Sequence, residues 1–157
     1  MRMPYRVLLV CLWFFVLVVL TCTVNLEALF YNHTIEFTFN LHPQLSELLK
    51  MDLTQIHPKW VMVKFGHFLG FGMMDVLLFN LIRKQKPALF IAILLAVLTE
   101  ICQLYFNRDG RLYDVAIDSA GIFLSHYAIQ TALLVRSKML TMWNERYTDK
   151  NMQHFKS

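Results

Sequence analysis

Residues 100–121 read EICQLYFNRDGRLYDVAIDSAG. The stretch begins inside one apolar helix pattern and ends inside another. It therefore puts carboxylates, an amide and guanidinium groups where a lipid bilayer normally excludes them. Ionisable residues within a membrane are rare and usually mark a functional site. Several of them at one depth predict a site inside a membrane protein.

The rest of the chain has the composition of a membrane protein. It has 157 residues, of which 57% are hydrophobic, and its mean hydropathy is +0.45. A helix needs about 20 mostly apolar residues to cross the hydrocarbon core. We therefore expect an all-α integral membrane protein with four transmembrane helices. The four apolar segments lie at residues 7–26, 61–82, 87–106 and 114–135.

The first apolar segment follows Arg2 and Arg6, which is also the arrangement of a secretory signal peptide. The apolar region of a signal peptide is only about 7–15 residues long and ends at a small-residue cleavage site. Here the run is longer and no Ala-x-Ala follows it. We expect a retained first span.

The positions of Lys and Arg predict the orientation, because these residues are enriched in cytoplasmic loops. In a four-span chain most of them gather on one side, in residues 1–6, 83–86 and 136–157. Both termini are therefore expected in the cytoplasm. The same charges argue against nucleic-acid binding, because they flank apolar spans and form no basic face.

This topology divides the chain into four parts. Two elements are predicted within the outer loop: a half-buried strand at Ile35–Leu41, from its alternating pattern, and a short amphipathic helix at residues 43–51. All three cysteines fall inside spans, which predicts packing roles and no disulfide or zinc cluster. The four parts are a cytoplasmic stub with the first span (1–26), an extracytoplasmic loop (27–60), a core of three spans (61–135) and a basic cytoplasmic tail (136–157).

Polar residues share one face on each of the last three spans, at the spacing of a helix turn. At about 1.5 Å per residue, Lys64 and Gln103 lie roughly 5 Å from the outer ends of their spans. His67 and Glu100 lie roughly 9 Å from those ends. The two aspartates occupy the first turns of the fourth span. Asp75 lies deeper, where it would either pair with Arg83 or reach a water-filled cleft. The outer polar layer comprises Lys64, His67, Glu100, Gln103, Asp114 and Asp118.

The same layer allows a purely architectural interpretation. Lys64 and Glu100 would form a buried ion pair, His67 would bond to Gln103, and a loop arginine would clamp Asp114. Buried charges do require partners. We favour a functional site, because so many polar groups in one layer cost more desolvation than packing requires.

The order and spacing of these residues resemble the VanZ-like family of bacterial membrane proteins, named for a protein associated with teicoplanin resistance. The family pattern is Lys-x-x-His-Phe, Glu-x-x-Gln, a loop Arg and Asp-x-x-x-(Asn/Asp)-x-x-Gly. The resemblance covers about residues 60–130. It implies a location in the bacterial cytoplasmic membrane, a role in the cell envelope and a link to glycopeptide or lipoglycopeptide resistance. The matching residues are Lys64, His67, Phe68, Glu100, Gln103, Arg108, Asp114, Asp118 and Gly121.

Two positions depart from that pattern. Asp118 stands where many relatives are expected to carry Asn, and it adds a second carboxylate one turn below Asp114. This addition favours a role for a cation or a proton. Arg111 is a second loop arginine beside Arg108, so the sequence leaves open which of the two acts.

The first functional hypothesis is an enzyme that acts at the outer leaflet on an envelope lipid or cell-wall precursor. Its candidate catalytic residues are Glu100, His67 and Asp114, with the first two as acid and base. Basic side chains would hold a phosphate or carboxylate of the substrate. The candidate ligand-binding residues are Lys64, Gln103, Arg108, Arg111 and Asp118.

Two further hypotheses remain open. A divalent metal would use His67, Glu100, Asp114 and Asp118 as ligands, although no metal motif such as His-Glu-x-x-His is present. Alternatively, a non-catalytic binding or accessory protein would capture a polar or anionic ligand, for example a glycopeptide, or would limit antibiotic access. Transport is a weaker hypothesis, because four spans without inverted repeats are a thin basis for it.

Overall fold

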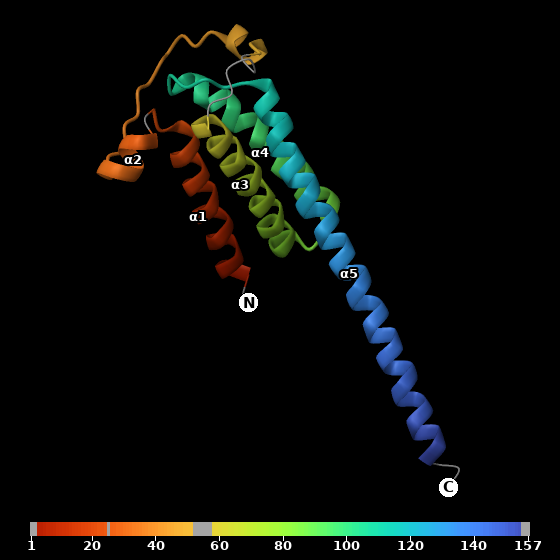
Figure 1. Cartoon of the computed structure of the whole chain (residues 1–157). Helices are drawn as coiled ribbons and strands as arrows, with labels where there is room; N and C mark the ends of the chain where they lie inside the picture. Colours follow the sequence, from red (N-terminus) through yellow and green to blue (C-terminus); the bar gives the residue numbers. More distant parts are fainter. Residues whose placement is uncertain (1–2, 25, 52–57, 155–157) are drawn as a thin grey trace. The chain divides into compact units, whose positions relative to one another are not determined.

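The structure is a computed structural model and describes residues 3–24, 26–51 and 58–154. Arg2, which entered the signal-peptide and orientation arguments, lies outside these ranges, as do residues 52–57 of the outer loop. The described residues contain no β-strand, so the all-α prediction is confirmed for them. The helices (Figure 1) are α1 (Met3–Cys22), α2 (Leu26–Asn32), the 3₁₀ helix η1 (Leu45–Leu49), α3 (Pro58–Ile82), α4 (Gln85–Tyr105) and α5 (Leu112–His154).

Three helices are long and apolar enough to cross a membrane, and they match the first three expected spans to within a few residues. The fourth expected span, 114–135, falls inside α5, which is not among the three. Polar residues such as Asp118 and His126 lower the hydropathy of that stretch. The candidate spans are Met3–Cys22, Trp60–Ile82 and Gln85–Tyr105.

The chain divides into two compact units, Met1–His126 and Tyr127–Ser157. The first contains α1 to α4 and the start of α5. In the described part of the second, α5 is a regular helix in which Thr131 Oγ1 donates to the Tyr127 carbonyl at 2.9 Å. Side chains from 131 to 147 are all exposed.

The core of the first unit forms where α1, α3 and α4 pack together, and small residues allow this packing. Helix α4 buries Ala88, Ala92 and Ala96 completely, one on each successive turn. Trp13 Nε1 on α1 donates to the Gly70 carbonyl on α3 at 2.9 Å. Helix α1 is therefore part of the bundle core.

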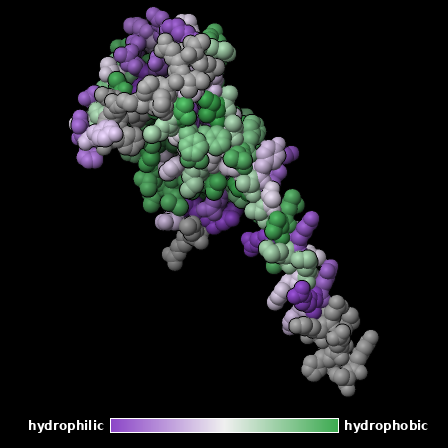
Figure 2. Space-filling model, in the orientation of Figure 1, coloured by the Kyte–Doolittle hydropathy of each residue, from purple (hydrophilic) through white to green (hydrophobic). Residues whose placement is uncertain are grey.

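The outer surface of this bundle is apolar, as the surface of a membrane span must be. Figure 2 shows a hydrophobic face along the helices, with hydrophilic residues at the loop end of the first unit. Large apolar side chains are exposed on each spanning helix. They include Leu8, Leu12 and Phe15 of α1, Phe65, Leu69 and Met73 of α3, and Phe90, Leu94 and Leu98 of α4.

Two helix ends close with a residue in the left-handed conformation. Arg83 has φ 62° and its N–H bonds to the Phe79 carbonyl at 2.8 Å, which ends α3. Asn107 has φ 57° after α4, and the N–H of Arg108 reaches back to the Gln103 carbonyl at 2.9 Å. This bonding pattern is a Schellman motif. It turns the chain back over the end of α4 and positions the start of α5.

The strand prediction for Ile35–Leu41 is wrong. Residues 33–40 have no regular secondary structure. The N–H of Asn40 instead donates to the Tyr105 carbonyl at 2.8 Å, at the end of α4. The alternating pattern places Phe37 and Phe39 against Phe106, with ring centroids 5.6 and 5.8 Å apart. The alternation reflects contact with a helix end, which requires no partner strand.

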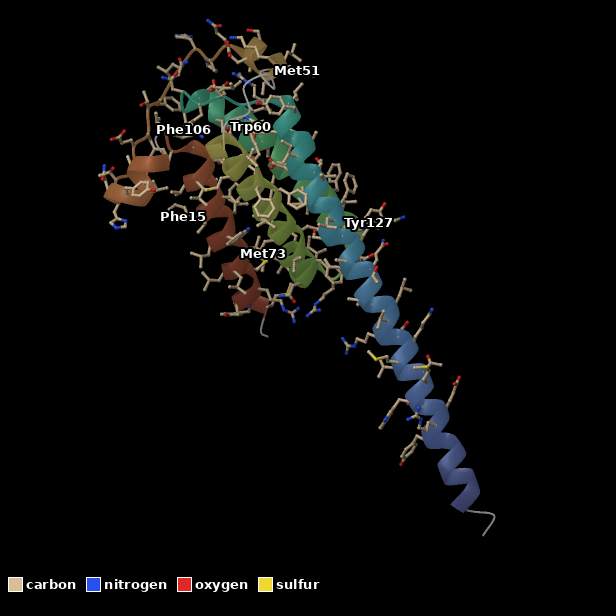
Figure 3. The ribbon with its side chains drawn as sticks, in the orientation of Figure 1. Phe15, Met51, Trp60, Met73, Phe106 and Tyr127 are labelled. Atoms are coloured by element: carbon tan, nitrogen blue, oxygen red, sulfur yellow. The ribbon has the colours of Figure 1, made fainter. Side chains whose placement is uncertain are left out.

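The predicted short helix at 43–51 is present as η1, over fewer residues. Trp60, at the start of α3, and Phe106, just after α4, lie at the loop end of the first unit (Figure 3). Met73 lies farther along α3 (Figure 3). The polar layer described next lies at this loop end.

Candidate functional site

Three helices bring His67, Glu100 and Asp118 together. The Nδ1 atom of His67 on α3 lies 3.4 Å from Oδ1 of Asp118 on α5 and 3.8 Å from Oε1 of Glu100 on α4. Both carboxylates are buried, with exposed fractions of 0% and 1%, and His67 is buried as well. The expected convergence of polar residues on one layer is therefore observed for α3, α4 and α5.

The helix faces explain this convergence. On α4 the buried stripe runs through Ala92 and Ala96 and then reaches Glu100 and Gln103 at its C-terminal end. The stripe changes from methyl groups to polar groups within two turns. On α3 and α5 the polar residues lie toward the N-terminal ends. Polar ends of three neighbouring helices thus meet at the same end of the bundle.

Glu100 is held by two hydrogen bonds. Gln103 Nε2 donates to Oε1 at 2.7 Å, and the backbone N–H of Arg111 donates to Oε2 at 2.9 Å. The second bond requires the loop to lie directly on α4. Gly110 allows this approach, because a Cβ there would collide with the Glu100 carbonyl oxygen. The loop after α4 is therefore part of the layer.

Lys64 pairs with Asp114, which corrects the Lys64–Glu100 pair of the architectural interpretation. Asp114 is buried and the Lys64 side chain is 15% exposed. The ammonium also lies 5.5 Å from the ring centroid of Trp60 and 5.2 Å from that of Tyr113, within cation–π range. The Lys64 side chain thus links α3 to the first turn of α5.

The two loop arginines bind the outer segments. Arg108 Nη1 donates to the Val24 carbonyl at 3.0 Å, just after α1. Arg111 is buried, and its Nη1 donates to the Glu47 carbonyl at 2.9 Å and to Glu47 Oε2 at 3.1 Å. A hydrogen bond from Lys50, with a further one from Arg111, holds the pKa of Glu47 below its ordinary value. Arg111 therefore fastens η1 to the outer end of the bundle.

A cavity of about 360 Å³ opens beside the layer, and this volume is in the range of small-molecule sites. Of the predicted site residues, Lys64, His67, Gln103 and Arg108 line it. Glu100, Asp114, Asp118 and Arg111 do not. The remaining lining residues are Val24, Trp60, Val63, Asn107, Asp109 and Tyr113.

Some of these lining residues escaped the sequence prediction. Trp60 and Tyr113 are not among the residues that the sequence predicts for the site, and Val24 carries no polar signal. Tyr113 directly precedes Asp114, so its neighbour in sequence could have pointed to it. Only the folded bundle identifies Val24.

Asp75 belongs to a separate cluster. Ser125 Oγ donates to its Oδ2 at 2.7 Å, so the expected pairing with Arg83 is wrong. Ser125 also donates to the Ile122 carbonyl, one turn earlier on α5. Asp75 is buried and lies two turns beyond His67 on α3. It offers a buried carboxylate outside the outer layer, useful as a control.

Comparison with known proteins identifies relatives by sequence. The family model for VanZ/LLP1 matches residues 6–135. An uncharacterized membrane protein, YwnJ of Bacillus subtilis (strain 168), is 34% identical over 118 residues, which cover 74% of this chain and 84% of the relative. No solved structure matches the chain.

Proposed function

Since the chain belongs to the VanZ/LLP1 family of membrane proteins, we propose that it is a multi-pass protein of the bacterial cytoplasmic membrane that acts on an anionic lipid or wall-precursor head group. The start of α5 would form the fourth span, and both termini would be cytoplasmic. The outer loop 27–60 would cover the site, the three spans of 61–135 would build it, and 136–157 would be a basic tail. The distribution of Lys and Arg supports this arrangement.

Basic groups on the cavity wall support an anionic ligand. Lys64 and Arg108 both line the cavity, and Gln103 adds an amide beside them. Guanidinium and ammonium groups are the usual partners of phosphate and carboxylate. Arg108 donates one hydrogen bond to the Val24 carbonyl. Because a guanidinium has five N–H donors, it can also bind a ligand. The head group of an envelope lipid or of a wall precursor carries the complementary charge.

The position of His67 carries the proposal. Its ring lines the cavity, while its Nδ1 faces the buried carboxylates of Asp118 and Glu100. A base oriented by a carboxylate is the usual arrangement for general acid–base catalysis. His67 would accept a proton from a water or hydroxyl in the cavity, and the carboxylates would stabilise the imidazolium. Water would be the attacking group in a hydrolysis or transfer reaction.

A non-catalytic binding function is the second candidate. Among the described residues that line the cavity, none is Ser, Thr or Cys, so a covalent mechanism through one of these three nucleophiles has no support there. In this version the pocket captures an anionic ligand or limits the access of a glycopeptide or lipoglycopeptide. The resistance role implied by the family name would then follow from association alone.

Mass spectrometry of lipids and wall precursors distinguishes the enzyme from the non-catalytic binding protein. Cells carrying the wild-type protein, Glu100→Gln, His67→Gln or the control Asp75→Asn would be compared at matched membrane levels. Glu100→Gln should fold, because Gln103 can rotate its amide and accept from the new one.

Accumulation of one precursor in Glu100→Gln and His67→Gln, but not in Asp75→Asn, is the result expected for an enzyme. An unchanged profile together with a lost resistance phenotype would favour binding. Loss of both variants from the membrane, while Asp75→Asn reaches it at the wild-type level, would show that the layer is scaffolding and would overturn both versions.

A further inference from the structure

We propose that His67, Glu100 and Asp118 together bind one divalent transition-metal ion, of the Zn²⁺ class, next to the cavity. The proposal deepens the function above by naming a cofactor for the same site, and it rests on that function only for the role of the ion in the reaction. With the ion bound, His67 would be a ligand and would no longer act as the general base, and the ion would instead lower the pKa of a bound water. The three side chains come from three different helices, and one donor atom of each lies within 4.8 Å of the other two.

The distances fit metal ligands better than hydrogen bonds. Nδ1 of His67 is 3.4 Å from Asp118 Oδ1 and 3.8 Å from Glu100 Oε1. A hydrogen bond between such atoms is normally about 2.7–3.2 Å long. Ligand atoms about 2.0–2.2 Å from a tetrahedral ion are separated by roughly 3.3–3.6 Å. The two separations from His67 are near this second range, and the two carboxylates lie within 4.8 Å of each other, so side-chain shifts would complete the coordination.

The donor atoms at the centre of the cluster lack other partners. Neither carboxylate oxygen of Asp118 has a hydrogen-bond partner within the described ranges, although the residue is fully buried. The same holds for Nδ1 of His67. A buried carboxylate without a partner is costly. A cation between these atoms would satisfy all of them at once.

In known metal sites, other residues hydrogen-bond to the ligands and orient them, and the same arrangement is present here. Glu100 is fixed by Gln103 Nε2 and by the N–H of Arg111, and each carboxylate oxygen retains a lone pair for an ion. Lys64 is engaged with Asp114 instead of the cluster. The ion pair of Lys64 is therefore made with a carboxylate outside the proposed ligand set.

The donor set selects the kind of ion. One imidazole with two carboxylates suits Zn²⁺ or Mn²⁺, whereas Ca²⁺ takes six to eight oxygen ligands and Mg²⁺ keeps several waters. Three protein ligands also leave a position for a water or an anionic oxygen, which is the pattern of catalytic rather than structural sites. His67 joins the cluster to the cavity wall, so a bound head group would lie close to that position.

Metal binding can be measured directly on the full-length protein, purified in detergent through a tag that contains no histidine. The metal-free protein would be titrated with Zn²⁺ by calorimetry and with Co²⁺ by visible absorption. We expect one equivalent of each ion, and intense Co²⁺ bands typical of a tetrahedral site. Asp118→Asn and His67→Gln should weaken Zn²⁺ binding by at least about tenfold. Even replacing a residue that only hydrogen-bonds to a ligand typically lowers metal affinity about 10–100-fold. Asp75→Asn should bind like the wild type.

Wild-type protein that takes up no Co²⁺ or Zn²⁺ would overturn the proposal, and this measurement needs no variant to fold. Unchanged affinity in Asp118→Asn, or an equal loss in Asp75→Asn, would also overturn it. Binding of inorganic phosphate to the protein in detergent tests the proposed function separately, through Arg108→Gln. If this variant loses phosphate binding while the wild type binds no metal, the head-group site stands and the metal site falls.

Discussion

Single glycines determine how closely the helices of the site approach one another. Gly121 on α5 lies directly against α3, where a Cβ would collide with the carbonyl oxygen of Phe68. Gly72 lies on the other side of the same contact, where an added Cβ would be 3.1 Å from the carbonyl oxygen of Gly121. Backbone-to-backbone packing of this kind is typical of membrane helices. It places Asp118, one turn before Gly121, against His67.

Replacing Gly121 with alanine tests this contact. Gly121→Ala should destabilise the protein by about 1–3 kcal/mol, the usual cost of overpacking, because backbone cannot move aside as a side chain can. Gly66→Ala is the matched control on α3, since a Cβ there meets nothing within 4 Å; it should be neutral or stabilising by about 0.5–1 kcal/mol. Thermal unfolding in detergent measures both. Equal stability of the two variants would contradict the close approach.

At the scale of the helices, Lys64 and Asp114 join α3 to the first turn of α5. The buried stripes of these helices would allow several rotations if they were purely apolar. An ion pair has one satisfactory geometry in a low-dielectric setting, so it can specify the register. The register decides whether Asp118 faces His67.

The pair can be tested by a double-mutant cycle. Lys64→Met alone should cost about 3–5 kcal/mol, because it removes the ammonium from a buried carboxylate. Lys64→Met with Asp114→Asn should recover most of that loss, since the charge is gone from both helices. Lys84→Met, at an exposed position, should change stability by no more than about 0.5 kcal/mol. Losses that simply add in the double variant would show that the two residues do not interact.

For the whole molecule, the proposed topology puts the cavity and the arginine loop on the outer side. The exposed apolar surface of α1, α3 and α4 supports an orientation across the bilayer. The basic residues at 83–86 fall at the opposite end of α3 from Lys64. Their position predicts that this turn is cytoplasmic.

Cysteine labelling in intact cells tests the topology. In a background without the native cysteines, single cysteines at Ser46 and Asp109, both exposed, should react with a membrane-impermeant thiol reagent. A cysteine at Gln85 should react only after the cells are opened. Labelling of Gln85 in intact cells, with protection of the other two, would invert the topology and place the site on the cytoplasmic side.

The sequence by itself determined the helical class, three apolar spans and the members of the polar layer. These follow from local properties: the length of an apolar run, the spacing of a helix turn, and the rarity of charge inside a span. The family motif could be recognised for the same reason, because it is a set of residue types at fixed spacings. The prediction of a strand at Ile35–Leu41 was wrong. An alternating pattern indicates which side chains are buried, but it does not indicate which element covers them.

Only the tertiary structure decided the partners. Lys64 could have met Glu100 or Asp114, and the sequence does not distinguish two carboxylates at similar depth on different helices. The choice depends on helix rotation and on the close contact at Gly121, which are properties of three packed helices together. The same holds for the assignment of Arg111 to Glu47 and of His67 to Asp118. Pairing between side chains is a long-range geometric outcome, so it appears only when the bundle is assembled.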